Sequence, residues 1–148
     1  MPLEPNPYDR PDLLNVRKDQ EDPVILYLIV RESLNMGPGK IAAQVGHAVG
    51  MLMGAFHRIK LDKYGEISQD LDNKYSMVSG WLRHSYRKVV LRADDKEWEK
   101  IKSSELYYFL VQDAGLTEVD PGSETVICLW PMLKSKAPKI IKKLQILK

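Results

Sequence analysis

The run "VILYLIVR", residues Val24–Arg31, is the stretch that decides the fold. Its first seven residues are all apolar, and several of them are β-branched. A strand buried on one face alternates apolar and polar residues, whereas a strand buried on both faces reads as a continuous apolar run. This stretch therefore predicts the central strand of an α/β sheet whose two faces are both covered by helices.

Strand-like and helix-like patterns alternate along the rest of the chain, which is typical of such a sheet. Acidic residues follow Asp94, so Asp94 or Asp95 is expected to cap a helix. The expected elements are a helix over 40–59, a loop or partial helix over 60–75, a short helix over 76–84, a strand over 87–93, a helix over 94–105, strands over 106–113 and 125–131, and a basic helix over 134–144 with Pro138 in its first turn.

The connection between the last two expected strands shows how the sheet is paired. The segment "AGLTEVDPGSE", residues 114–124, is rich in turn residues and carries no helical pattern. A parallel crossover needs a dozen residues or more, usually including a helix. At least one antiparallel pair is therefore expected, which gives a mixed sheet within an α/β fold.

Composition limits the domain organisation and the compartment. With 148 residues the chain is expected to form one domain, and a net charge of +2 is too small to indicate a nucleic-acid binder by itself. Residues 1–23 are rich in proline and charge and lack the apolar core of a secretory signal, so we expect a flexible N-terminal arm before a domain over 24–148. No apolar run reaches the 18 residues that a membrane span requires.

Cysteine and histidine usage argues against disulfides and metals. Cys128 is the only cysteine, so no internal disulfide forms, which favours a reducing, cytoplasmic compartment. Its place within an apolar strand favours a core residue over a nucleophile. The three histidines, His47, His57 and His84, show no zinc-binding spacing, so a structural metal is not expected.

The stretch "NMGPGKIAAQVGHAVG", residues 35–50, resembles a phosphate-binding loop only at first sight. A P-loop needs a glycine at position 34 and a serine or threonine at position 41, and the chain has Leu34 and Ile41 there. A site for a nucleotide with magnesium is therefore excluded. Lys40 is then either a solvated surface lysine or a functional group at the carboxyl ends of the strands, where open α/β sheets bind ligands.

The helix that starts at Lys40 has three distinct lines of residues at 100° per residue. Three glycines within it each cost about 1 kcal/mol relative to alanine, so close approach of another backbone is expected. Ordinary packing against a second helix is the preferred interpretation, with a partner subunit or another bound chain as alternatives. The lines are Ile41, Val45, Ala48, Leu52 and Phe56; Lys40, Gln44 and His47; and Ala43, Gly46, Gly50 and Gly54.

A second unusual stretch is "VQDAGLTEVDPGSET", residues Val111–Thr125. Asp113 ends an apolar strand, Gly115 permits a sharp turn, and the hydroxyls of Thr117, Ser123 and Thr125 follow. One carboxylate and three hydroxyls are thus expected around one edge of the sheet. Taken alone, the same residue types also build ordinary turns.

Together, "MGPGKIAAQVGHA" and "QDAGLTEVDPGSETV" resemble the second, archaeal and eukaryotic type of peptidyl-tRNA hydrolase, and the resemblance extends from Val24 to the C-terminus. It implies a three-layer α/β/α sandwich with a four-stranded mixed sheet, often assembled as a homodimer. The implied activity is hydrolysis of the ester between a peptide and the 3′ ribose of tRNA, with no cofactor. Peptidyl-tRNA is then the partner, and recycling of tRNA from stalled translation is the purpose.

The same resemblance implies a set of site residues. Asp113 would act as general base or orient the attacking water, and Lys40 would stabilise the oxyanion or hold the terminal phosphate. Two threonines would orient the water or the ribose. The implied catalytic residues are Lys40, Asp113, Thr117, Thr125 and His47, and the implied substrate-binding residues are Gln44, Gly39, Gly115, Ser123 and Arg31.

Three departures from the family pattern leave other functions open. Pro38 stands where the family has a lysine, Leu116 replaces an arginine or another polar residue, and segment 60–75 fits loosely. The first alternative is a module that binds tRNA, another RNA or a protein without catalysis. The second is a hydrolase of a different acyl ester.

Overall fold

The computed structural model describes residues 22–62, 69–83, 86–116 and 118–148. Nearly all of the expected N-terminal arm, residues 1–23, therefore lies outside the described residues. The same holds for His84 and for Thr117, one of the expected site residues.

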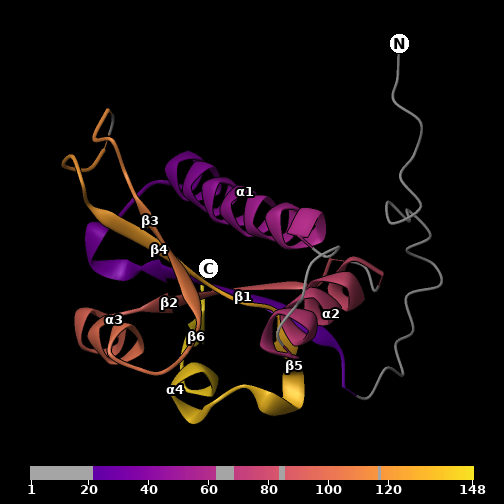
Figure 1. The fold of residues 1–148 in the computed structure, drawn as a ribbon. Helices are drawn as coiled ribbons and strands as arrows, with labels where there is room; N and C mark the ends of the chain where they lie inside the picture. The colour runs from indigo at the N-terminus through magenta and orange to yellow at the C-terminus, as the bar shows by residue number, and fades with distance from the viewer. Residues whose placement is uncertain (1–21, 63–68, 84–85, 117) are drawn as a thin grey trace, which may run out of the picture.

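A mixed sheet forms the centre of the molecule (Figure 1). Its strands are β1 (Val24–Arg31), β2 (Lys88–Ala93), β3 (Tyr108–Gln112), β4 (Glu124–Leu129), β5 (Met132–Leu133) and β6 (Gln145–Ile146). The order is β3-β4-β1-β2-β6, with β5 beside the start of β1. The pair β1–β2 is parallel and the other pairs are antiparallel. The mixed sheet with an antiparallel β3–β4 pair is confirmed, but it has six strands rather than four, because two two-residue strands extend it.

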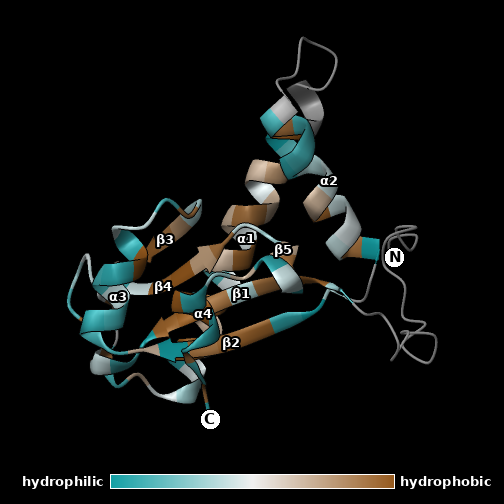
Figure 2. Cartoon of the chain, turned by 90° about the horizontal axis from the view of Figure 1, so that it is seen from below, coloured by the Kyte–Doolittle hydropathy of each residue, from teal (hydrophilic) through white to brown (hydrophobic). Residues whose placement is uncertain are grey.

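Strand β1 has a separate hydrophobic core on each of its faces, as its sequence predicts. Val24, Leu26, Leu28 and Val30 belong to a core formed with α1 (Pro38–Asp62) and α2 (Gln69–Arg83). Ile25, Tyr27 and Ile29 belong to a second core with α3 (Asp95–Lys102) and α4 (Lys139–Lys142). Figure 2 shows the strands mostly in brown and α3 largely in teal. The helices therefore cover both faces of the sheet.

Helix α2 is longer than the sequence predicts, since it begins at Gln69, within the segment 60–75 expected to be a loop or partial helix. Its first turn carries Asp70, which suits a helix N-terminus and forms an ion pair with Lys74 at 2.8 Å. Further along, Val78 and Trp81 are buried against the sheet. Local polarity suggested a loop, whereas the apolar face of the helix stabilises the longer element.

The expected C-terminal helix over 134–144 is wrong. The structure has a 3-10 turn, η3 (Lys134–Lys136), then the short α4, and finally β6 paired with β2. Proline disfavours helical conformation in the residue before it, and Ala137 is extended (φ −62°, ψ 126°). Pro138 therefore ends one turn and caps the next, so a continuous helix cannot form.

Among the described residues, the glycine line of α1 packs against no other helix, contrary to the preferred interpretation. Ala43, Gly46, Gly50 and Gly54 are all exposed. A Cβ atom built on any of the three glycines would meet nothing within 4 Å among the described residues. This face of α1 is open to solvent.

No helix in the described part of the chain combines the length and apolar character needed to cross a membrane.

The strand directions bring the ends of four strands to one edge of the sheet. Strand β4 is antiparallel to both β1 and β3, so β1, β2 and β3 all end at the edge where β4 begins. Helix α1 starts beside this edge, after the turn η2 (Glu32–Leu34). Residues far apart in the sequence therefore meet here.

Candidate active site

An ion pair between α1 and the end of β3 forms the centre of this edge. Lys40 Nζ donates to Asp113 Oδ1 at 2.8 Å, although 73 residues separate the two in the sequence. Their side chains are only 11% and 8% exposed, so water screens the pair poorly. Of the two interpretations of Lys40, the structure excludes the solvated surface lysine.

Gln44, one turn after Lys40, connects this pair to β4. Its Nε2 donates to Asp113 Oδ1 at 2.9 Å, and its Oε1 accepts from Thr125 Oγ1 at 2.5 Å. Gln44 and Thr125 are 1% and 0% exposed. The Asp113 carboxylate can only accept, so it fixes the NH₂ end of the Gln44 amide towards itself, and the Thr125 hydroxyl donates to the buried oxygen at the other end.

The loop after β3 holds the Asp113 carboxylate through its backbone. Asp113 N donates to Ser123 O at 2.9 Å and Gly122 N donates to Asp113 O at 2.7 Å, which closes the base of the loop. Gly115 N then donates to Asp113 Oδ2 at 2.6 Å. Gly115 adopts φ +77°, and a Cβ atom there would lie 2.3 Å from Pro121 N. Only glycine fits this position.

Gly115→Ala should destabilise the protein more than Gly122→Ala. Both glycines have positive φ, +77° and +81°, but a Cβ atom on Gly122 would meet nothing within 4 Å. We expect Gly122→Ala to lose about 1 kcal/mol of unfolding free energy from backbone strain, and Gly115→Ala about 3 kcal/mol because it also meets the backbone of Pro121. Urea unfolding measures both, and equal losses would contradict this account of the loop.

Glu118 connects the same loop to the start of α1. Its Oε2 accepts from Gly37 N at 2.9 Å, across 81 residues of sequence. The sequence reasoning did not identify Glu118, because nothing in the local pattern distinguishes it from a solvated loop carboxylate.

Two residues that depart from the family pattern lie beside this contact. Pro38 occupies the first turn of α1, where proline is well tolerated, and Leu116 is 88% exposed.

Hydrogen bonds keep Asp113 ionised at neutral pH. The Lys40 ammonium is the main cause that lowers the pKa of Asp113, with help from the Gly115 N–H and the Gln44 amide, while burial acts in the opposite direction.

Burial alone raises the pKa of the Cys128 thiol to about 12. Cys128 is fully buried, so its prediction as a core residue is confirmed and a thiolate nucleophile is excluded there.

Several expected site residues place no side chain on the ion pair in the part of the chain that the structure describes. His47 and Gly39 are exposed on α1. The Ser123 carbonyl accepts from Asp113 N, so this residue contributes its backbone.

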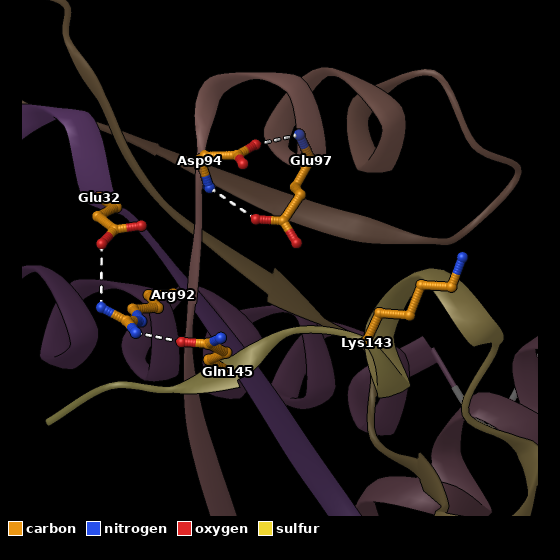
Figure 3. Close-up of a pocket in the computed structure, with 6 residues that line it drawn as sticks. All are labelled: Glu32, Arg92, Asp94, Glu97, Lys143 and Gln145. Atoms are coloured by element: carbon orange, nitrogen blue, oxygen red, sulfur yellow. Dashed lines mark hydrogen bonds and ion pairs between the residues drawn. The ribbon is translucent and has the colours of Figure 1, made fainter.

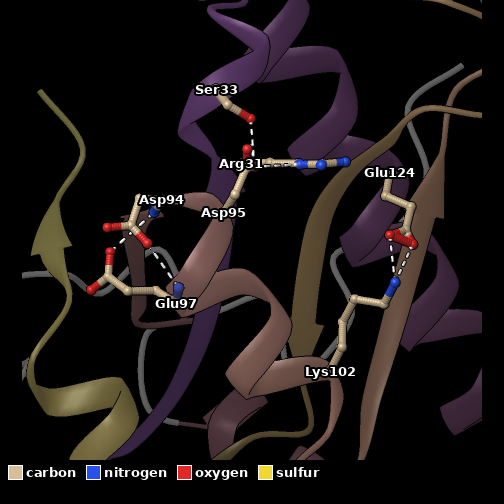
Figure 4. Close-up of polar contacts among 7 residues, drawn as sticks. All are labelled: Arg31, Ser33, Asp94, Asp95, Glu97, Lys102 and Glu124. Atoms are coloured by element: carbon tan, nitrogen blue, oxygen red, sulfur yellow. Dashed lines mark hydrogen bonds and ion pairs between the residues drawn. The ribbon is translucent and has the colours of Figure 1, made fainter.

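Arg31 lies on the opposite face of the sheet, with α3 (Figure 4). Its Nε donates to Asp95 Oδ1 at 3.1 Å, and its guanidinium lies 5.9 Å from the centre of the Trp98 ring. Beside it, Lys102 Nζ contacts both carboxylate oxygens of Glu124 at 2.6 and 2.7 Å. A polar cluster thus lies behind β4, separated from the Lys40–Asp113 pair by the sheet.

A pocket of about 280 Å³ lies at the end of β2 (Figure 3). Its Arg92 guanidinium is already engaged, since Arg92 Nη1 donates to Glu32 Oε1 at 3.0 Å and Arg92 also donates to Gln145. The lining residues are Glu32, Arg92, Asp94, Glu97, Lys143 and Gln145. No group of three or more histidine, cysteine or acidic residues suited to a metal occurs in the ranges that the structure describes.

The sequence of this chain is similar to a family model and to several known proteins. The family model described as peptidyl-tRNA hydrolase PTH2 matches residues 24–147. A Methanopyrus kandleri protein named peptidyl-tRNA hydrolase is 36% identical over 126 residues, which cover 82% of this chain and 96% of the relative. One from Pyrobaculum aerophilum is 34% identical over 131 residues, covering 84% and 98%. A Caenorhabditis elegans protein named probable peptidyl-tRNA hydrolase 2 is 35% identical over 107 residues, covering 69% of this chain but only 30% of that longer protein.

Proposed function

The chain belongs to the peptidyl-tRNA hydrolase PTH2 family, and on that premise we propose that it hydrolyses the ester between a peptide and the 3′ ribose of tRNA. Water attacks the ester carbonyl, the carbonyl oxygen takes up the negative charge, and the ribose oxygen leaves with a proton. The products are a free peptide and a reusable tRNA. The observation that carries this proposal is the shielded Lys40–Asp113 pair at the ends of the strands.

Asp113 is proposed to hold the attacking water. A carboxylate offers about four lone-pair positions, and three are taken by Lys40, Gln44 and the Gly115 N–H. The remaining position lies on Oδ2 and suits a water proton. Since its pKa is lowered, Asp113 is a weak base in the resting enzyme, so its first role is to orient the water. It accepts the proton as the attack on the ester proceeds.

Lys40 is proposed to stabilise the oxyanion. An ammonium group has three N–H donors, and the described residues show one of them used, on Asp113. The other two remain for the ester carbonyl oxygen, whose charge grows only in the transition state. A cation already held in place by a carboxylate needs little reorganisation when that charge develops.

Thr125 is proposed to act through Gln44, because a fully buried hydroxyl cannot reach a substrate. Thr125→Val should leave the buried Gln44 Oε1 without its donor, loosen the hold of Gln44 on Asp113, and lower kcat by about ten-fold with little change in KM. Thr125→Ser restores the hydroxyl and should recover most of the rate. A valine variant with full activity, or a serine variant as slow as valine, would contradict this role; turnover of peptidyl-tRNA measures both.

Other expected contacts belong to the same proposal. Gly39, His47 and Ser123 are proposed to line the path of the tRNA end, together with Thr117, which lies outside the described residues. Arg31 is proposed to contact the tRNA backbone from the other side of the sheet edge. Backbone contacts of this kind weaken as salt rises.

The test of the function is release of free tRNA from an N-blocked aminoacyl-tRNA by the purified protein. Release supports the hydrolase, and binding without release would support the module that only binds RNA. If the protein neither releases nor binds tRNA, the result would support a hydrolase of a different acyl ester. The intact Lys40–Asp113–Gln44 arrangement and the names of the relatives both favour the hydrolase over the alternatives.

The expectations on architecture, assembly and location also belong to the proposal. Hydrophobic cores on both faces of β1 support a three-layer α/β/α sandwich. We propose association of two copies into a homodimer in the cytoplasm, where translation takes place. Light scattering on the purified protein tests the assembly, and a monomer at micromolar concentration would contradict it.

A further inference from the structure

The first turn of α1 provides no side-chain acceptor for the backbone N–H of Gly37, the residue before the helix. Gly37 precedes the helix, and its carbonyl accepts the first helical hydrogen bond from Ile41 N at 3.0 Å. In a capping box, a glutamate or glutamine at the third helical position accepts from the N–H of the cap residue. That position is Lys40, which has no acceptor. The side chain used for the site is thus unavailable for capping.

Helix α3 of the same chain shows the complete arrangement (Figure 3). Asp94 Oδ1 accepts from Glu97 N at 2.8 Å, and Glu97 Oε1 accepts from Asp94 N at 3.0 Å. Both partners lie within four residues of sequence. In α1 the corresponding acceptor is Glu118, from the loop that carries Asp113.

We propose that Glu118 is a positioning residue that latches the 113–123 loop to the first turn of α1 and thereby holds Asp113 against Lys40. This inference rests on the proposed function, since the reaction it serves is peptidyl-tRNA hydrolysis. The loop is fixed at its base by the hydrogen bonds between Asp113 and Gly122 and between Asp113 and Ser123. Glu118 adds a second anchor further along the loop. This anchor is the backbone N–H of Gly37, at the start of the helix that carries Lys40.

Two observations besides the hydrogen bond support the latch. A Cβ atom on Gly37 would lie 2.9 Å from Glu118 Oε1, so glycine leaves the space that the carboxylate occupies. The neighbouring Val119 is buried in the core beneath α1, which holds this part of the loop down. In addition, a carboxylate at the positive end of α1 offsets the unfavourable position of the Lys40 cation there.

The kinetic test compares Glu118→Ala with Glu118→Gln. A shift of the reacting groups by a fraction of an ångström slows chemistry strongly, so Glu118→Ala should lower kcat about ten-fold with KM within about two-fold of the wild type. Glutamine keeps the acceptor oxygen and should restore most of the rate. A glutamine variant as slow as alanine, a change confined to KM, or an unchanged kcat would each overturn the latch.

Glu97→Ala is the matched control, because it removes the same capping contact from α3. Glu97→Ala and Glu118→Ala should lower the melting temperature by similar amounts, a few degrees at most. Only Glu118→Ala should slow turnover. If Glu97→Ala slowed turnover equally, the effect of Glu118 would reflect stability alone and the proposal would fail.

Gly37→Ala tests the same contact from the other side. Its added methyl group displaces the Glu118 carboxylate, the flexible end of a side chain, without touching Lys40 or Asp113. It should slow turnover as much as Glu118→Ala. The double variant should be no slower than either single one, since both remove one interaction. Multiplied effects would show that the two residues act independently and would overturn the latch.

Titration of the Asp113 carboxyl by NMR gives a readout that does not depend on activity. Loss of the Glu118 charge alone would lower the pKa of Asp113, because a nearby anion raises it. A looser contact with Lys40 would raise that pKa, since Lys40 is the main cause that lowers it. We expect a rise in Glu118→Ala and no change in Glu97→Ala. A wild-type protein that releases no tRNA would refute the function, whereas an unmoved or lowered pKa would refute the latch.

Discussion

Asp113→Asn should lower kcat for peptidyl-tRNA hydrolysis by about 10³-fold while the protein stays folded. Asparagine keeps the shape of the side chain but removes the negative charge that holds Lys40 and the proposed water. One of the two oxygens becomes an NH₂ group, which would face the donors of Lys40 and Gln44 or of Gly115. The site therefore loses both its base and its arrangement of donors.

The measurement is single-turnover release of tRNA, together with a thermal unfolding curve. Asp70→Asn provides a matched control, because Asp70 also pairs with a lysine at 2.8 Å, on the exposed side of α2. That variant should keep wild-type kcat and nearly wild-type stability, as expected for a surface ion pair. An Asp113→Asn enzyme within ten-fold of the wild-type rate would remove Asp113 from the mechanism.

The sequence predicted the centre of the fold well because the signal there is local. A short, continuous apolar run rich in β-branched residues favours a strand buried on both sides, and Val24–Arg31 is buried over nearly its whole length. The short turn-rich link after β3 forced the antiparallel β3–β4 pair. The end of the chain was predicted poorly, because basic residues at helical spacing hid the effect of Pro138 on the residue before it.

The site was predictable only in part, because its organisation depends on contacts across 69 to 81 residues. Motif resemblance selected Lys40 and Asp113, and the structure places them in contact. It did not predict that Thr125 is buried and touches Gln44 rather than the site's surface. Nor did it suggest Glu118, whose partner is a backbone N–H.

The glycine line of α1 marks another limit of sequence reasoning. Helical geometry correctly placed these residues on one face, yet the assumption that glycines imply a neighbour within the chain was wrong for the described residues. Each glycine lowers helix propensity, but burial of Leu52 and Ala48 on the opposite face stabilises the helix by packing. Local propensity therefore says little about which face of a long helix is covered.

Lys40→Met should lower kcat by about 10²- to 10³-fold and should also change the pH dependence of the activity that remains. Methionine keeps the apolar stem but has no charge, so the oxyanion loses its proposed stabilising group. Lys40 is also the main cause of the lowered pKa of Asp113, so its removal raises that pKa. Burial, which raises the pKa of Asp113, is then no longer opposed by the Lys40 ammonium.

The direction of the pH effect follows from that change. Below the pKa of Asp113 the carboxyl is protonated and cannot hold the water as proposed, so activity falls on the acid side. In the wild type this fall lies below the ordinary aspartate value of about 4, and in Lys40→Met it should move to higher pH. Lys74→Met, which removes the lysine paired with Asp70, should leave both rate and profile unchanged. An acid limb that stayed in place would show that Lys40 does not control the ionisation of Asp113, even if the rate fell as expected.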